Sequence, residues 1–279
     1  MRVAAVQLNS RNDKRRNLEV AERLVREAAA DGARLIALPE KWNLLGPAAD
    51  LVAGAEPLDG ASIEAARSWA RELGAHILAG SIGELVEGEE RLFNTSVLID
   101  AQGEIAASYR KIHLFDVEVG GITYRESEHE QPGDQIVIGD AGGVELGLTV
   151  CYDLRFPELY RILAVRGARV ITVPAAFTMA TGRDHWEVLL RARAIENQAF
   201  VLAPGQHGEA PPGYSSYGRS MIVDPWGVVL GQVPDGEGFV CAELDFAAQA
   251  RIRETLPSLA NRRPQSYAWP EPAGAGAVG

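Results

Sequence analysis

Cysteine and long apolar runs are scarce in this 279-residue sequence. Its two cysteines, Cys151 and Cys241, are too few for the disulfide framework of a small secreted protein. No apolar run approaches the ~18 residues of a membrane-spanning helix. Met1 leads directly into the strand-like RVAAVQL, without the charged and apolar segments of a signal peptide. We therefore expect a cytoplasmic enzyme with no membrane partner.

Positive charge is also in short supply, because the net charge is −11 at pH 7 and the pI is near 5.0. A nucleic-acid-binding protein needs a basic face, so we expect no nucleic-acid partner. Only three lysines occur, Lys14, Lys41 and Lys111, against 24 arginines. Arginine is the habitual cation of this chain, so the role of each lysine needs its own explanation.

Several motifs of known chemistry are missing. The five histidines are scattered without metal-ligand spacing, and no HExxH segment occurs. The sequence has no GxSxG elbow, no P-loop, and no GxGxxG segment after a strand. We expect neither a metal ion nor a cofactor.

The order of elements predicts an α/β fold. Apolar strands alternate with amphipathic helices in the first half, which favours parallel pairing, and hairpins at Gln102-Gly103 and Trp226-Gly227 favour antiparallel pairing. The apolar content of 47% can bury a sizeable core. We expect one domain over residues 1–269 and a disordered tail over residues 270–279. The expected strands are 2–9, 34–40, 76–82, 92–100, 104–110, 144–153, 169–177, 200–206, 218–225, 227–233 and 240–246, and the expected helices are 13–30, 61–74, 157–167, 183–197 and 246–256.

Residues 112–134 are predicted as a long, irregular and polar loop, which is typical of a functional segment. Cys151 follows the apolar run GLTV, and a helix is expected directly after it. Ligands gather at the carboxyl ends of strands in open α/β sheets, and a helix N-terminus there favours thiolate over thiol. A lone cysteine is otherwise more often buried and inert, and we assign that role to Cys241.

Glu40 and Lys111 also follow apolar strands. A carboxylate at the mouth of a buried sheet is partly desolvated, which favours a role as general base. A lysine in the same place can stabilise an oxyanion. Each alone is more simply a surface residue. Together with Cys151 they supply the nucleophile, base and cation that acyl transfer requires.

The segments LPEKWN, YRKIHLFD and TVCYDLRFPELYR resemble the three signature segments of the nitrilase superfamily of carbon–nitrogen hydrolases. The resemblance implies a four-layer α-β-β-α sandwich with mixed sheets and a homodimer or higher homo-oligomer. It implies a Glu-Lys-Cys triad of Glu40, Lys111 and Cys151, with the backbone N–H of Tyr152 as a second oxyanion donor. Glu126 matches a second glutamate that the superfamily places beside the lysine, although a salt-bridging loop residue is the simpler alternative.

Within the superfamily, the sequence is similar to the branch containing deaminated-glutathione amidase and ω-amidase. That likeness implies a small carboxylate-bearing amide as substrate, ammonia release through a thioester, and substrate contacts by Arg155, Phe177 and Thr181. Arg219 stands where the branch more often has histidine. The alternatives are α-ketoglutaramate, an N-carbamoyl amine or a nitrile as substrate, and an inactive binding or scaffold protein of the same fold.

Overall fold

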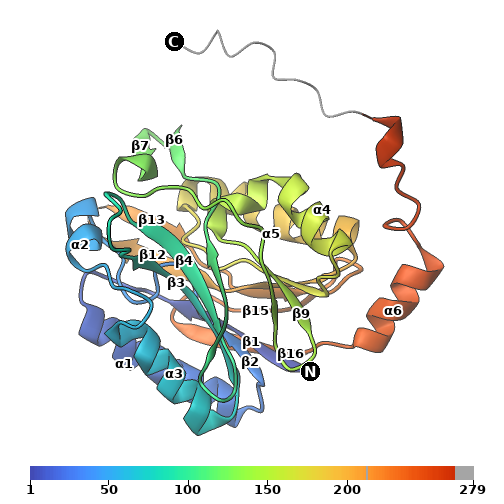
Figure 1. Cartoon of the computed structure of the whole chain (residues 1–279), viewed down its shortest axis with the longest axis horizontal. Helices are drawn as coiled ribbons and strands as arrows, with labels where there is room; N and C mark the ends of the chain where they lie inside the picture. Colours follow the sequence, from blue (N-terminus) through green and yellow to red (C-terminus); the bar gives the residue numbers. More distant parts are fainter. Residues whose placement is uncertain (212, 268–279) are drawn as a thin grey trace.

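Two β-sheets form the centre of the computed structural model, which describes residues 1–211 and 213–267 (Figure 1). In this part of the chain the first sheet has eight strands and the second has six. The first runs in the order β13-β12-β1-β2-β3-β4-β5, with β16 also paired to β1, and the second in the order β15-β14-β11-β10-β9-β8. The first sheet consists of β1 (Arg2–Leu8), β2 (Leu35–Ala37), β3 (His76–Glu84), β4 (Phe93–Ile99), β5 (Ile105–Arg110), β12 (Gly205–Ala210), β13 (Tyr214–Tyr217) and β16 (Gly238–Glu243). The second consists of β8 (Ile138–Asp140), β9 (Glu145–Leu148), β10 (Val170–Thr172), β11 (Phe200–Ala203), β14 (Met221–Val223) and β15 (Val229–Gln232).

Strand pairing follows the expected division between crossovers and hairpins. Strands β1, β2 and β3 pair in parallel, as do β9, β10 and β11, because helices connect them. The hairpins β4–β5 and β14–β15 pair in antiparallel fashion. The expectation of mixed sheets is confirmed.

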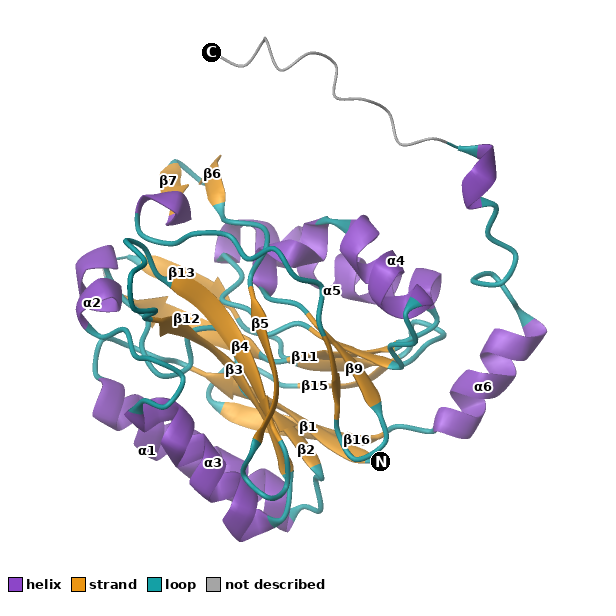
Figure 2. Cartoon of the chain, viewed as in Figure 1, coloured by secondary structure: helices purple, strands orange, loops and turns teal. Residues whose placement is uncertain are grey.

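Helices cover the outer face of each sheet (Figure 2). One apolar core lies between the first sheet and the helices α1 (Lys14–Ala30) and α3 (Ala61–Leu73). The other runs between the two sheets and continues under α4 (Pro157–Val165) and α5 (Met179–Asn197). The layers are therefore helix, sheet, sheet and helix, as the four-layer sandwich predicts. The last helix, α6 (Phe246–Thr255), lies to one side of them (Figure 1).

The helix ends carry the signals that the sequence shows. The Asp13 side chain accepts a hydrogen bond from the backbone N–H of Arg16 and caps α1. Gly74 ends α3 with φ at 60°, a left-handed conformation that glycine adopts at little cost. Pro157 occupies the first turn of α4, where its missing N–H has no role.

Some expectations were wrong. Residues 112–134 are not uniformly irregular, because they contain the short hairpin of β6 (Asp116–Val119) and β7 (Ile122–Arg125) and the 3₁₀ helix η1 (Glu126–Glu128). Helix α2 (Ala48–Ala53) is too short to show a helical period, so it was not predicted. The predicted tail, residues 270–279, lies outside the described residues. No helix among the described residues is both long and apolar enough to span a membrane.

Candidate active site

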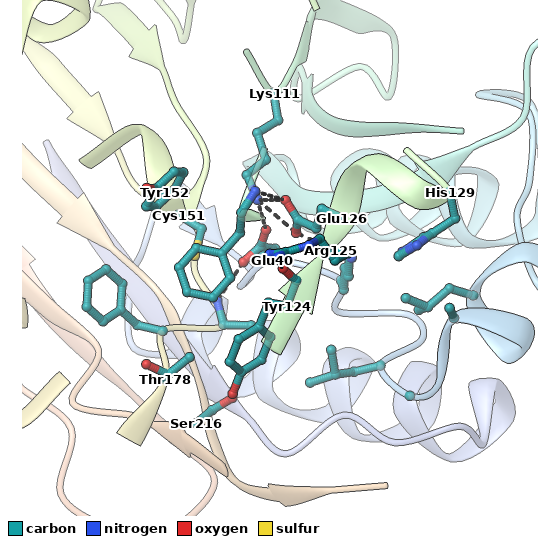
Figure 3. Close-up of a pocket in the computed structure, with 18 of the residues that line it drawn as sticks. Glu40, Lys111, Tyr124, Arg125, Glu126, His129, Cys151, Tyr152, Thr178 and Ser216 are labelled. Atoms are coloured by element: carbon teal, nitrogen blue, oxygen red, sulfur yellow. Dashed lines mark hydrogen bonds and ion pairs between the residues drawn. The ribbon is translucent and has the colours of Figure 1, made fainter. Parts of the chain in front are cut away.

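A cavity of about 390 Å³ is lined by side chains from segments that follow strands of both sheets (Figure 3). Glu40 and Lys111 reach it from segments that follow β2 and β5 of the first sheet. Cys151 reaches it from a segment that follows β9 of the second sheet. The two sheets thus bring together all three residues that the sequence singled out.

Glu40 is buried, with 2% of its surface exposed, and its carboxylate accepts hydrogen bonds from three donors. Its Oε1 accepts hydrogen bonds from Asn94 Nδ2 at 2.9 Å and from Lys111 Nζ at 3.1 Å. Its Oε2 accepts one from the backbone N–H of Ala176 at 2.8 Å. The carboxylate is therefore fixed in orientation at the cavity wall, as a general base must be.

Lys111 is 1% exposed and lies between two carboxylates. Its Nζ is 2.7 Å from Glu126 Oε2 and 3.0 Å from Glu126 Oε1, in addition to its bond to Glu40. Burial favours the neutral amine, but Glu126 and Glu40 outweigh it and raise the pKa of Lys111 well above its usual range. Lys111 is therefore a permanent cation.

Glu126 is the first residue of η1 and also faces the cavity. Its Oε2 accepts a hydrogen bond from the backbone N–H of Phe115 at 2.8 Å. Burial would raise its pKa, but Lys111 and Lys41 reverse that effect and hold the pKa of Glu126 at about 2. The structure thus places Glu126 beside the lysine, where the family resemblance put it, and keeps it charged.

Cys151 begins the 3₁₀ helix η2 (Cys151–Arg155) with φ at 47°, a left-handed conformation that costs a non-glycine residue about 1–2 kcal/mol. Its backbone N–H donates to Pro174 O at 2.8 Å, which fixes the bend. Burial raises the pKa of the Cys151 thiol well above its usual range, and Glu40 raises it further, against the expected effect of the helix N-terminus. The helix N-terminus does not overcome these effects, so the thiol needs a base.

Asp153 links the Cys151 bend to the Lys111 segment, although the sequence did not single it out. Its buried carboxylate accepts hydrogen bonds from the backbone N–H of Val150 at 2.8 Å and from the hydroxyl of Tyr109 at 2.7 Å. It also lies 2.7 Å from His113 Nδ1. Tyr109 and His113 flank Lys111 in the sequence, so one carboxylate sets the spacing between thiol and ammonium.

The four remaining predicted residues also line the cavity: Tyr152, Arg155, Phe177 and Thr181. Tyr152 lies in the first turn of η2, where backbone N–H groups have no partner within the helix. The Arg155 guanidinium lies 5.1 Å from the centre of the Phe177 ring and 3.2 Å from His185 Nδ1. Among residues 1–211 and 213–267, no carboxylate pairs with Arg155, which leaves its charge available to an anion.

The sequence reasoning gave no role to four titratable residues of the cavity lining, Lys41, Arg125, Glu128 and His129. Lys41 is buried and forms an ion pair with Glu130, and His129 lies across the cavity from Cys151 (Figure 3). The shortage of lysine was the one available signal for Lys41. Within the described residues, no cluster of three or more histidine, cysteine or acidic side chains could hold a metal ion.

The fold and the site define a cysteine-dependent hydrolase of carbon–nitrogen bonds. The chain belongs to the carbon–nitrogen hydrolase family, whose model matches residues 2–254. It is 42% identical over 264 residues to a Synechocystis protein named deaminated glutathione amidase, covering 93% of this chain and 97% of that one.

Two solved structures extend the comparison. The NitFhit protein of C. elegans superposes with a TM-score of 0.86 at 36% identity, over 96% of this chain and 66% of that longer chain. A mutant amidase of the nitrilase superfamily from Nesterenkonia superposes with a TM-score of 0.79 at 29% identity, over 95% of both chains. That structure shows covalent addition of the acetamide moiety of fluoroacetamide at its active-site cysteine.

Proposed function

We propose that this enzyme is an amidase that hydrolyses small amides of α-keto acids, with deaminated glutathione as its foremost candidate substrate. The observation that carries this proposal is the buried group of Cys151, Glu40 and Lys111 in one cavity, with Arg155 unpaired by any described carboxylate at the cavity wall. The name of the Synechocystis relative supports the choice of substrate.

In the first step, Glu40 accepts the proton of Cys151 as the sulfur attacks the amide carbon. The raised pKa of the thiol makes this transfer necessary, and the fixed carboxylate makes it possible. Negative charge then develops on the amide oxygen. Lys111 and the backbone N–H of Tyr152 stabilise this oxyanion.

The ammonium of Lys111 has three N–H donors, and two of them serve one carboxylate in the resting site. One of the two bonds to Glu126 can be exchanged for a bond to the oxyanion while the other holds Lys111 in place. Glu126 thus holds the Lys111 ammonium in place while one of its N–H donors becomes available to the oxyanion.

Glu40 then returns its proton to the amide nitrogen, the carbon–nitrogen bond breaks, and the acyl group remains on Cys151 as a thioester. Glu40 next deprotonates a water molecule that attacks the thioester. The carbon–sulfur bond breaks, and the thiolate regains a proton. The leaving group depends on the substrate: a primary amide releases ammonia, and deaminated glutathione releases cysteinylglycine.

A panel of amides tests the substrate class. Deaminated glutathione and α-ketoglutaramate both yield 2-oxoglutarate, so one coupled assay of that product compares them directly. N-carbamoyl amines and nitriles serve as the alternatives. We expect the highest kcat/KM with an α-keto acid amide. Turnover of none of these compounds by the folded protein would instead favour the inactive scaffold of the same fold.

Arg155→Ala is expected to raise KM for an anionic amide far more than for a neutral amide of the same length. A guanidinium can bind a carboxylate through two parallel hydrogen bonds, and losing a desolvated charge pair costs about 2–5 kcal/mol. Steady-state kinetics on the two substrates measure the difference. Arg183→Ala, which removes an arginine from the exposed surface of α5, is the control. An equal effect on both substrates would make Arg155 a structural residue.

We also propose that the enzyme is a homodimer and acts in the cytoplasm. Two free thiols suit a reducing compartment. On the outer side of α5, Val188 and Ile195 are seven residues apart on one helix face and are at least half exposed. The 226–227 turn contacts this face through Ile195 and Arg191, and Trp226 there is 59% exposed. Such a patch is typical of an interface between protein chains.

Ile195→Asp is expected to convert a dimer of 30.0-kDa chains into a monomer, because it places a charge in the apolar patch. Analytical ultracentrifugation measures the masses. Ile162→Asp, at a residue of α4 that is 39% exposed, controls for a general effect of a new surface charge. A wild-type protein that sediments as a monomer would contradict this part of the proposal.

A further inference from the structure

A second buried ion pair lies directly beside the proposed triad. Lys41 Nζ is 2.7 Å from Glu130 Oε1, and the two side chains are 8% and 1% exposed. Lys41 follows Glu40 in the chain and has φ at 51°, a left-handed conformation that turns it away from an extended path. Its backbone N–H donates to Ser81 Oγ at 3.0 Å, which holds that turn. The local structure thus places the two neighbours, Glu40 and Lys41, in one cavity wall.

Lys41 also reaches the carboxylate that tethers Lys111. Its Nζ is 3.7 Å from Glu126 Oε1, the same oxygen that accepts a hydrogen bond from Lys111 at 3.0 Å. The buried charges therefore alternate in sign along a chain of contacts. The order is Glu40, Lys111, Glu126, Lys41 and Glu130.

The choice of lysine at position 41 agrees with this placement. All three lysines of the chain form ion pairs at least partly shielded from water, with Lys14 bound to Glu56 and the others in this cavity. Burial of an unpaired ammonium would be very unfavourable, so each buried lysine implies a dedicated carboxylate. Glu130 is that partner for Lys41, and burial raises the pKa of Glu130 although Lys41 opposes the effect.

We propose that Lys41 and Glu130 are positioning residues, which act through Glu126 to keep Lys111 aimed at the oxyanion. This inference rests on the proposed function and deepens it. Lys41 separates two carboxylates, Glu126 and Glu130, that would otherwise face each other in a buried site. Lys41 also attracts Glu126 to the side opposite Glu40. Lys111 is therefore shared between the two carboxylates and does not pair with Glu40 alone.

Loss of Lys41 would let Glu126 bind a proton at a higher pH. The titratable and charged groups around Glu126 are then Lys111, Glu40, Glu130, His129 and Cys151, together with Asp116, Arg125 and Glu128 of its own loop. At neutral pH Glu126 stays ionised, but without Lys41 beside its Oε1 the carboxylate can move toward Lys111 and Glu40, and the ammonium is no longer held in its resting direction. At acidic pH a protonated Glu126 releases Lys111 altogether. In either case Lys111 pairs more closely with Glu40. The general base is then less able to accept a proton, and the oxyanion loses the donor that Lys111 supplies.

The test uses two variants of the full-length enzyme, Lys41→Met and the double variant Lys41→Met/Glu130→Gln. Methionine keeps the length of the lysine stem without its charge. In the single variant Glu130 is left buried with only His129, 3.7 Å away, in place of its ammonium partner, which lowers stability. The double variant removes both charges, so it is expected to recover the thermal stability that Lys41→Met loses.

A positioning role predicts that this recovered stability is not accompanied by recovered turnover. Both variants should lose about tenfold or more in kcat, less than the ~10²–10³ of a deleted oxyanion donor, with KM little changed. The acid limb of the kcat profile should move up by about one pH unit in Lys41→Met, because Glu126 has lost a nearby cation, and by less in the double variant, because the repelling Glu130 carboxylate is removed as well. A double variant with the kcat of the wild type would show that the pair is merely structural, and the proposal would be overturned. Wild-type behaviour of folded Lys41→Met would overturn it as well.

Lys14→Met is the matched control, because it removes a lysine from another partly buried ion pair, whose two residues do not line the cavity. It should lower stability without shifting the pH profile.

A second measurement separates this inference from the choice of substrate. The rate of alkylation of Cys151 by iodoacetamide, in a Cys241→Ala background, uses the same base and needs no substrate. Its acid limb should move in the Lys41 variants even if no amide of the panel is hydrolysed. An unmoved limb in the alkylation rate would overturn the proposal on its own.

Discussion

Replacing Cys151 with alanine is expected to lower kcat by a factor on the order of 10⁶, the loss seen when a protease nucleophile is deleted. Without the sulfur no thioester forms, and Glu40 is left without its proton donor. The fold should persist, because the side-chain change is small and the bend is held by backbone hydrogen bonds. Product formation under saturating substrate measures the effect, and circular dichroism checks the fold.

Cys241→Ala is the matched control for this experiment. Cys241 lies on β16, partly exposed, with Asp31 as a neighbour, and takes no part in lining the cavity. Its replacement should leave kcat unchanged. Mass spectrometry after iodoacetamide treatment should find Cys151 modified in both the wild type and this control. Substantial turnover by folded Cys151→Ala would remove the thiol from the mechanism.

Lys111→Arg is expected to cost about 10²–10³ in kcat even though the charge is preserved. Lys111 is enclosed between Glu40 and Glu126, with three acceptor oxygens within 3.1 Å of one nitrogen. A guanidinium is longer and planar, and its donors point in a fixed fork, so it cannot place one donor on each acceptor and exchange one for the oxyanion. The loss should appear in kcat with KM little changed, which is typical of an interaction made in the transition state.

Arg110→Lys is the reverse exchange at the neighbouring position. The Arg110 side chain lies outside the cavity and binds Glu84 through two hydrogen bonds of 2.8 Å. This variant should turn over normally and lose only a little stability. Stopped-flow measurement of the first turnover would place the defect of Lys111→Arg in acylation. Near-normal kcat in folded Lys111→Arg would leave the oxyanion without the cation proposed for it.

The sequence predicted the long elements and the centre of the site for a common physical reason. Helices such as α1 and α3 show a full apolar period, and the buried strands end at the charged or nucleophilic residues Glu40, Lys111 and Cys151. Signals of this kind are local, so they can be read without knowing what packs where. The order of the sheets was not readable in the same way.

Strand β12 illustrates that limit. The chain leaves the second sheet after β11, passes Pro204, and joins the first sheet by pairing Gly205 with Gln7. The expected strand 200–206 merged these two elements, because nothing local distinguishes a strand that continues from one that changes sheets.

Glu130 escaped notice for a related reason. It lies in an acidic stretch with Glu126 and Glu128, which favours the interpretation of a solvated loop. Only η1 and the pairing of Glu130 with Leu92 turn it inward, and that bridge joins residues far apart in the sequence.

Because the catalytic residues come from two sheets, the packing of the core between the sheets affects the catalytic rate. The base and the cation are mounted on one sheet and the nucleophile on the other, so the apolar side chains between the sheets act as the spacer that sets the sulfur-to-carboxylate distance. A methyl group added or deleted at Leu35 or Val170, well away from the substrate, alters that spacer. Catalytic rate can therefore drift during evolution through core substitutions that leave every residue of the cavity untouched.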